Sequence, residues 1–213
     1  MIHVYGIVDG LAELPAVTGL DGAPLERREV EGLELVLSRG ATPPSAEVSR
    51  EAVLRHARVV EELSARSAAI LPAQLGRAFR DDDELAAAVR EQAPQLASGL
   101  ERVRGCVEFG LRAIPAERTE QVEAGSGADY MRARLDEVRR RERLVERLHE
   151  PLARLARATA LRPQGDELNA AYLVARDDVA EFREAVARLE RTPELTVVCT
   201  GPWPPYSFAT EAP

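Results

Sequence analysis

Residues 168–201, "LNAAYLVARDDVAEFREAVARLERTPELTVVCTG", decide the fold class of the second half of the chain. The runs at 168–175 and 194–201 are short, largely apolar and bounded by polar residues, which is typical of buried strands. The residues between them predict a helix, because apolar side chains recur at helical spacing at Val179, Phe182, Val186 and Leu189. The stretch therefore predicts a strand, a helix and a second strand in succession.

The residues before this stretch supply the rest of the pattern. "GCVEFGLRAI" (105–114) predicts a strand, and a long helix is expected from Asp129 to Ala160. One apolar stripe runs along that helix through Met131, Leu135, Val138, Val145, Leu148, Leu152 and Leu155. Pro151 should bend the helix, and a short strand is expected near 159–163. The second half thus has the order β–α–β–β–α–β, which is that of ferredoxin-like domains.

Strands dominate the start of the first half. "IHVYGIV" (2–8) is β-branched and aromatic and ends at a "DG" turn, so it predicts a strand. Two short strands should follow on either side of a tight turn near Gly32. "AILPAQLGRAF" (69–79) predicts an irregular or edge strand, because Pro72 lacks the N–H that a central strand donates.

Two helices are predicted between and after these strands. The first follows the break "TPPS" and is capped by Ser45 or Ser49. The second covers 81–105 and opens with acidic residues, which suit the positive end of the helix dipole. It contains Pro94, which should kink or divide it.

The length and charge of the chain limit its fold and its partners. Its 213 residues suit two α+β domains, an N-terminal one over 1–104 and a ferredoxin-like one over 105–213 that holds the long bent helix and the C-terminal end. The net charge of −8 argues against nucleic-acid binding, since such domains are usually basic. The chain opens without a basic leader or cleavage site, and no apolar run approaches the length that spans a bilayer. We therefore expect a cytoplasmic protein without nucleic-acid or membrane partners.

A search for catalytic, cofactor-binding or metal-ligating residues gives no candidate. His3, His56 and His149 lie in separate predicted elements and form no paired ligand motif. The "DDDE" run at 81–84 is more typical of a helix start than of a calcium site, which needs roughly six to eight converging oxygens. The "GSG" at 125–127 lacks the residues of a phosphate-binding loop and suits a hinge.

A basic patch, "RRRER", lies on the predicted long helix. Arg139, Arg140 and Arg143 are candidates for binding a partner protein. Acidic residues such as Asp136 interleave with the arginines, which is also typical of a solvated helix face with ion pairs. Nucleic-acid binding through this patch is disfavoured, because aromatic side chains that could stack on bases are missing. The sequence leaves the partner surface and the solvated face as alternatives.

The chain closes with "TGPWPPYSFA" (200–209), although aromatic residues make up only 4% of the sequence. The prolines favour an extended path and reduce the entropy lost when the segment is fixed. The candidate residues here are Trp203, Pro204, Pro205, Tyr206 and Phe208. They suit either a structural strap across the interface of the two domains or a hydrophobic contact for a partner protein.

This ending, with "AAYLVARDDVAEF" before it, resembles the F/L type of gas vesicle accessory proteins. Further segments resemble that family in the same order along the chain: "VYGIV", "AILPAQLGRAF", "GCVEFGLRAI" and "DYMRARL". The resemblance covers nearly the whole chain, and the ending is its most specific part.

The resemblance implies a protein of two α+β domains that is not an enzyme, takes part in gas vesicle formation and uses no cofactor. It implies binding to the apolar major shell protein before or during nucleation, other gas vesicle accessory proteins as further partners, and a location with gas vesicles. A shell subunit that exposes apolar surface is prone to aggregate, and a soluble acidic partner could keep it dispersed. The alternative is a regulatory module of tandem ferredoxin-like domains that binds a small ligand.

Overall fold

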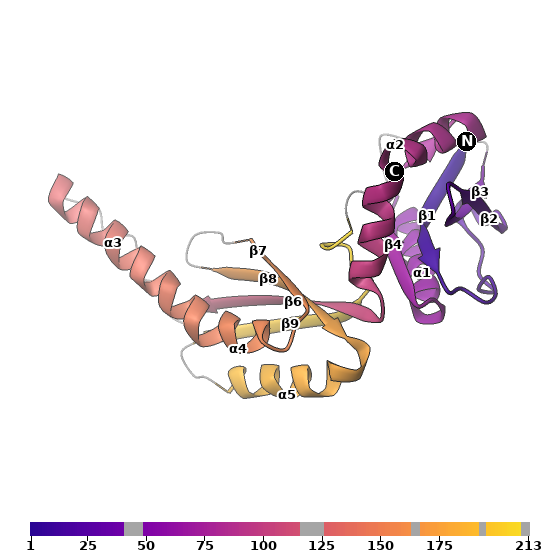
Figure 1. Cartoon of the computed structure of the whole chain (residues 1–213). Coiled ribbons are helices and arrows are strands. Elements are labelled where there is room, and N and C mark those ends of the chain that lie inside the picture. The colour runs from indigo at the N-terminus through magenta and orange to yellow at the C-terminus, as the bar shows by residue number, and fades with distance from the viewer. Residues whose placement is uncertain (41–48, 116–125, 163–166, 192–194, 210–213) are drawn as a thin grey trace. The chain divides into compact units, whose positions relative to one another are not determined.

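The structure, a computed structural model, describes residues 1–40, 49–115, 126–162, 167–191 and 195–209. It contains helices and two antiparallel sheets, which confirms the predicted α+β class (Figure 1). The chain divides into a first unit, Met1–Cys106 with Trp203–Pro213, and a second unit, Val107–Pro202. The sequence-based division placed the aromatic end in the C-terminal domain, whereas here it groups with the first unit.

The first unit is built on one antiparallel sheet. Its elements before the first helix are β1 (Ile2–Asp9), the 3₁₀ turn η1 (Leu20–Gly22), β2 (Leu25–Val30) and β3 (Leu33–Arg39), and those after it are β4 (Ala69–Pro72) and β5 (Ala78–Phe79). The strands pair in the order β2-β3-β1-β4, with β5 also paired to β1. The irregular strand expected at 69–79 is thus two short strands, and β4 ends the order, as Pro72 predicts.

A tight turn at Glu31 and Gly32 joins β2 to β3. Both residues have positive φ, 51° and 75° respectively, and Val30 pairs with Leu33 across the turn. Two successive residues of positive φ make the turn whose twist matches that of hairpin strands. The predicted turn near Gly32 is confirmed.

Helix α1 (Arg50–Arg66) begins after Ser49, whose hydroxyl accepts a 3.1 Å hydrogen bond from the Ala52 N–H. This cap confirms one of the two predicted positions, and Ser45 lies outside the described residues. The helix contributes buried side chains to the core: His56, Val59, Val60 and Leu63. Val53 shares the helical spacing of these residues but is 46% exposed, so the first turn of α1 does not face the core.

Helix α2 (Asp82–Val103) follows β5 and is continuous through Pro94. Pro94 therefore does not divide the helix, and Figure 1 shows that α2 bends along its length. Asp81 caps its start by accepting a 2.9 Å hydrogen bond from the Glu84 N–H.

A buried polar network ties α1 to the sheet of the first unit. The hydroxyl of the fully buried Tyr5 accepts a 2.7 Å hydrogen bond from the Leu20 N–H and lies 2.9 Å from the Ser38 hydroxyl. The Nε2–H of His56 donates a 3.0 Å hydrogen bond to the carbonyl oxygen of Ala73, and its ring centroid lies 5.2 Å from that of Tyr5. Burial lowers the pKa of His56, so the core holds the neutral ring.

The second unit has the predicted β–α–β–β–α–β order. Its strands and helices are β6 (Cys106–Pro115), α3 (Gly127–Leu144), α4 (Glu150–Ala153), β7 (Ala158–Leu161), β8 (Leu168–Ala175), the 3₁₀ turn η3 (Arg176–Asp178), α5 (Val179–Leu189) and β9 (Leu195–Trp203). The strands pair in the order β7-β8-β6-β9, with β7 antiparallel to β8. Strand β7 is the short strand expected near 159–163.

The long helix ends earlier than predicted. A π-helical turn, η2 (Val145–His149), follows α3, and α4 ends at Ala153. Strand β7 therefore begins within the region that was expected to be helical up to Ala160. Pro151 accounts for the interruption, because it has no N–H to donate to the carbonyl four residues earlier. The expected bend is thus a change of helix type just before the proline.

An aromatic cluster forms the centre of the second unit. Phe109, Tyr172 and Phe182 are fully buried. The ring centroid of Phe182 lies 4.9 Å from that of Phe109 and 5.4 Å from that of Tyr172. Leu148 and Leu152, from the end of the long helix, pack in the same cluster. Helices on either side of β7 and β8 in the chain therefore share one core.

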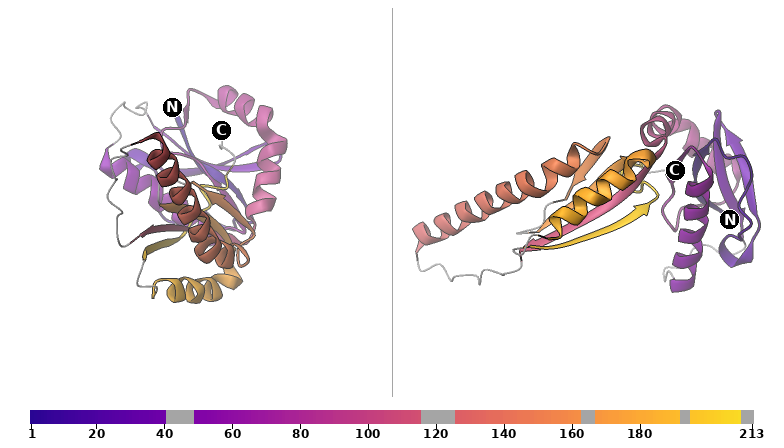
Figure 2. Two further views of the ribbon diagram at one scale, coloured as in Figure 1. Left: turned by 90° about the vertical axis from the view of Figure 1, so that its left-hand side faces the viewer. Right: turned by 90° about the horizontal axis from the view of Figure 1, so that it is seen from below.

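The apolar stripe of the long helix is buried only at its C-terminal end. Met131, Leu135 and Val138 on α3 are 65%, 49% and 44% exposed. Figures 1 and 2 show α3 extending beyond the sheet of the second unit, so its first turns lie away from that sheet. The helical spacing of apolar residues thus predicted that they share one face of the helix, but it did not predict which part of that face is buried.

The close approach of β9 to β6 predicts that Gly201→Ala destabilises the protein. Gly201 has a φ of 118°, and a Cβ there would lie 2.7 Å from the carbonyl oxygen of Glu108. Gly76 is the matched control, because its φ is 99° and a Cβ there meets nothing within 4 Å. We expect Gly201→Ala to lose about 1–3 kcal/mol more free energy of unfolding than Gly76→Ala in urea titrations. Equal losses would contradict the close packing.

The buried His56 predicts a loss of stability in mild acid. Its pKa in the folded chain is lower than the ordinary 6.5, so the unfolded chain binds the proton more tightly. Above about pH 6.5, protonation of His56 therefore costs the folded state nothing. Below that, the free energy of unfolding falls as the pH drops through the lowered pKa.

Urea unfolding at about pH 7.5 and about pH 5.5 measures this effect. His56→Gln keeps a donor for the Ala73 carbonyl but does not titrate, so its stability should change less between the two pH values. The same pH dependence in both proteins would show that His56 does not carry it.

Candidate functional site

The C-terminal aromatic segment, residues 203–208, is fastened to the first unit. Pro204, Pro205 and Phe208 are buried. The guanidinium of Arg102 on α2 donates a 2.6 Å hydrogen bond to the carbonyl oxygen of Phe208. Turn hydrogen bonds hold the segment itself, including one of 2.8 Å from the Tyr206 N–H to the Pro204 carbonyl. The segment therefore has a defined path along the first unit.

Two aromatic side chains of this segment stay at the surface. Trp203 is 44% exposed and Tyr206 is 40% exposed, whereas Phe208 is 7% exposed. The five predicted site residues thus separate into three that anchor and two that are presented. Half-exposed Trp and Tyr side chains on an anchored backbone are well suited to protein contacts, because little entropy is lost when a partner binds them.

The candidate arginines of the long helix lie on α3. Arg139 and Arg143 are exposed, and Arg140 lies between them on the same helix. This helix belongs to the second unit, and the aromatic segment belongs to the first. The two predicted sets therefore form two candidate surfaces, one on each unit.

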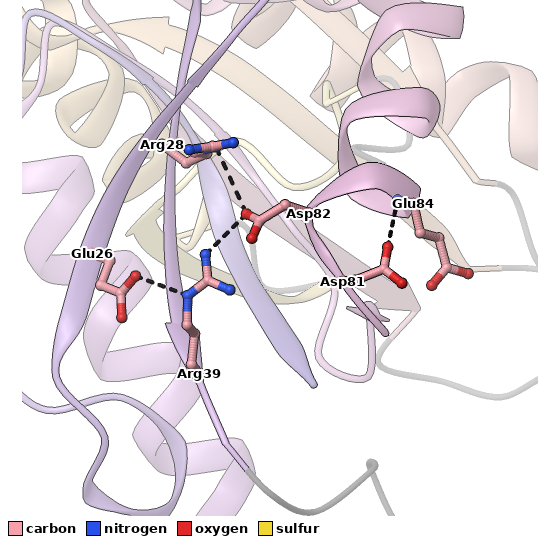
Figure 3. A network of polar contacts seen from close by, with 6 residues as sticks. All are labelled: Glu26, Arg28, Arg39, Asp81, Asp82 and Glu84. Atoms are coloured by element: carbon pink, nitrogen blue, oxygen red, sulfur yellow. Dashed lines mark hydrogen bonds and ion pairs between the residues drawn. The ribbon is translucent and has the colours of Figure 1, made fainter.

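The acidic run at the start of α2 is used for capping and ion pairing (Figure 3). Asp82 lies 2.9 Å from Arg39 and 3.7 Å from Arg28, and Arg39 also pairs with Glu26 at 3.0 Å. The hydrogen bond from Arg39 holds the pKa of Asp82 below its usual range. The side chain of Glu84 turns back to accept the Arg80 N–H at 2.7 Å. Among the described residues, no group of three or more His, Cys, Asp or Glu side chains is placed to hold a metal ion.

The other polar motifs have structural partners. The Nδ1 of His149 lies 3.0 Å from the Tyr172 hydroxyl within the core of the second unit. Ser126 of the "GSG" motif caps α3 by accepting a 3.2 Å hydrogen bond from the Asp129 N–H. Ser126 thus marks a helix start, while Gly125 lies outside the described residues. In the described part of the chain, no helix has the length and apolar character needed to cross a membrane.

The first unit has open hollows that contain ion-paired side chains. One lies beside α1 and contains Arg55, which pairs with Glu51 at 3.0 Å. Another lies between the sheet and α2 and contains Arg104, which pairs with Asp9 and Glu101. Both hollows are open, whereas pockets that bind small ligands usually enclose most of the ligand's surface.

Comparison with known proteins identifies the family. A family model described as "Gas vesicle synthesis protein GvpL/GvpF" matches residues 1–210. Gas vesicle protein L of Streptomyces sp. (strain CB03234) is 34% identical, over 92% of this chain and 80% of that protein. The chain belongs to the GvpL/GvpF family. Gas vesicle protein F2 of Halobacterium salinarum (strain ATCC 700922 / JCM 11081 / NRC-1) is 27% identical, over 97% of this chain and 91% of its own length.

Two solved structures share the fold of this GvpL/GvpF family member. The gas vesicle protein GvpF from Anabaena sp. PCC7120 matches with a TM-score of 0.81 at 18% identity, covering 100% of this chain and 97% of that one. GvpF from Microcystis aeruginosa has the same TM-score and identity, covering 98% of each chain. The likeness shows that the fold is shared over nearly the whole chain.

Sequence reasoning missed two features of these surfaces. It did not identify Arg102 as a partner of the C-terminal end, because these residues are far apart in the chain and their contact exists only in the folded unit. It also did not distinguish the exposed from the buried part of the apolar stripe. Met131 and Leu152 belong to the same stripe, and only the position of the sheet separates them.

The anchored path of the aromatic segment predicts different effects for its buried and exposed rings. Phe208→Ala should lower the free energy of unfolding by about 3 kcal/mol, because it leaves a cavity under the segment. Trp203→Ala should cost less than about 1 kcal/mol, since that ring is half exposed. Urea unfolding followed by circular dichroism measures both variants. Equal losses would mean that Phe208 does not anchor the segment.

Proposed function

We propose that this chain is a non-enzymatic gas vesicle assembly protein that binds the apolar major shell protein during nucleation. The observation that carries the proposal is the family match over residues 1–210 of the 213-residue chain. Relatives across nearly the whole length are named as gas vesicle proteins. We also assign the second unit to the ferredoxin-like arrangement, which its element order and strand order support.

The proposed contact for the shell protein is the exposed part of the C-terminal aromatic segment. Trp203 and Tyr206 offer apolar rings with polar edges, while Phe208 and the two prolines fix the backbone beneath them. Rigid aromatic side chains of this kind dominate the energetics of many protein interfaces. The net charge of −8 would keep a complex with an apolar subunit dispersed. The complex is proposed to form in the cytoplasm, in association with gas vesicles.

The second proposed partner surface is helix α3 with Arg139, Arg140 and Arg143. It lies on the second unit, so it can serve a different partner, such as another gas vesicle accessory protein. Exposed apolar side chains accompany these arginines, among them Met131 at 65% exposure. A solvated helix face with ion pairs alone would not explain why those apolar side chains are presented to water.

Co-purification with the major shell protein from the same organism tests the shell contact. We expect the double variant Trp203→Ala, Tyr206→Ala to retain at least about tenfold less shell protein than the unmodified chain, as loss of interface aromatics usually does. Leu161→Ala is the control, because Leu161 is similarly exposed, at 42%, but lies on β7 of the second unit.

Circular dichroism must show that each variant is folded. Equal retention by the double variant would move the contact away from the aromatic segment. Loss of binding in Leu161→Ala to the same degree would place it on the second unit. A lack of binding by the unmodified chain would contradict the proposed contact with the shell protein.

A further inference from the structure

Helix α3 carries an exposed apolar stripe made of Met131, Leu135 and Val138, called here the α3 stripe. At 100° per residue these three side chains lie within about 60° of one another around the helix. Their spacings of four and then three residues are those along which two helices pack in a coiled coil. Figures 1 and 2 show that α3 extends beyond the sheet of its own unit, and all three side chains of the stripe are exposed.

Arginines border the α3 stripe on both sides. Around the helix, Arg132 and Arg139 lie about 80–100° to one side of Met131, and Arg134 lies about 60° to the other. All three arginine side chains are exposed. Asp129 pairs with Arg132 at 3.1 Å and lies about 160° from Met131, on the far side of the helix. The positions that would flank a second helix are therefore basic.

The charge of α3 is opposite to that of the whole chain. Residues 127–144 contain six arginines and four acidic residues, which gives +2, whereas the chain carries −8. Four residues after Val138, the next position on the same face is the exposed Glu142, so the exposed apolar part of the stripe ends there. The surface is thus a short apolar seam within a basic border, on an otherwise acidic protein.

We propose that the α3 stripe docks an amphipathic helix of a partner protein, with an apolar seam bordered by Asp and Glu. The apolar side chains of the two helices would interdigitate, and the partner's carboxylates would pair with Arg132, Arg134 and Arg139. This inference rests on the proposed function, in which the chain binds protein partners. It adds that the partner at α3 presents an apolar helix face bordered by carboxylates.

Other occupants fit the charges and shape of the stripe less well. A second copy of the chain that packed α3 against α3 would bring arginine borders together, which is unfavourable. A membrane surface favours a wide apolar face with large side chains such as Trp, Phe and Leu. The α3 stripe is narrow, and its spacing matches a single facing helix.

Binding of a synthetic helical peptide to the full chain tests the inference. The probe is a labelled heptad peptide with leucine at a and d and glutamate at e and g, and its match has lysine at e and g. Fluorescence anisotropy should show binding of the acidic peptide, weakened by salt, and at least about tenfold weaker binding of the lysine peptide.

Variants of exposed residues assign the contact to the stripe. Leu135→Gln keeps a good helix former and should weaken acidic-peptide binding by about tenfold or more, as should Arg139→Glu. Arg188→Glu is the matched charge reversal on α5 and should leave binding unchanged, because that arginine is exposed on another helix.

Several results would overturn the inference. They are a lack of acidic-peptide binding, equal binding by the Leu135→Gln variant, and equal weakening by Arg188→Glu. Self-association in sedimentation that disappears in Leu135→Gln would favour a second copy instead. Leu135-dependent binding to phosphatidylserine vesicles without peptide binding would favour a membrane. Because the shell protein is absent from these assays, their failure is distinct from failure of the shell contact.

Discussion

The packing of one end of the long helix against the core of the second unit leaves the apolar side chains at its other end exposed. Leu148 and Leu152 are buried in the aromatic core, and His149 lies 3.0 Å from the Tyr172 hydroxyl in the same place. Pro151 lies next to this contact and has no N–H for a helical hydrogen bond. The α-helix becomes a π-helical turn over Val145–His149, just before the proline. Before that point α3 continues past the sheet, and its apolar side chains remain in water.

The same balance between anchoring and exposure occurs at the C-terminal end. Phe208 and the two prolines bury against the first unit, and Arg102 holds the backbone, while Trp203 and Tyr206 stay half exposed. Exposed apolar side chains on a chain of net charge −8 are consistent with a protein that meets apolar partners without aggregating. Membership of the GvpL/GvpF family gives these surfaces a shared context in gas vesicle formation.

The sequence predicted the helices, strands and turns that depend on neighbouring residues. It missed the features that depend on contacts between residues far apart in the chain. Helical periodicity found α5, and the strands flanking Gly32 followed from turn chemistry. The end of the long helix was placed too late, because the start of β7 depends on pairing with β8 rather than on local propensity. The sequence identified the candidate residues of the C-terminal segment but not which of them are exposed. Which of its rings are buried depends on the folded first unit, in which Arg102 bonds to the Phe208 carbonyl across the chain, and no local pattern reveals this.

Removing the gene from its native host, and then restoring it, tests the proposed role in gas vesicle assembly. We expect electron microscopy of cells without the gene to show no gas vesicles or misshapen ones, and the unmodified gene to restore normal vesicles. Normal vesicles in a clean deletion that keeps the neighbouring genes expressed would contradict a role in assembly.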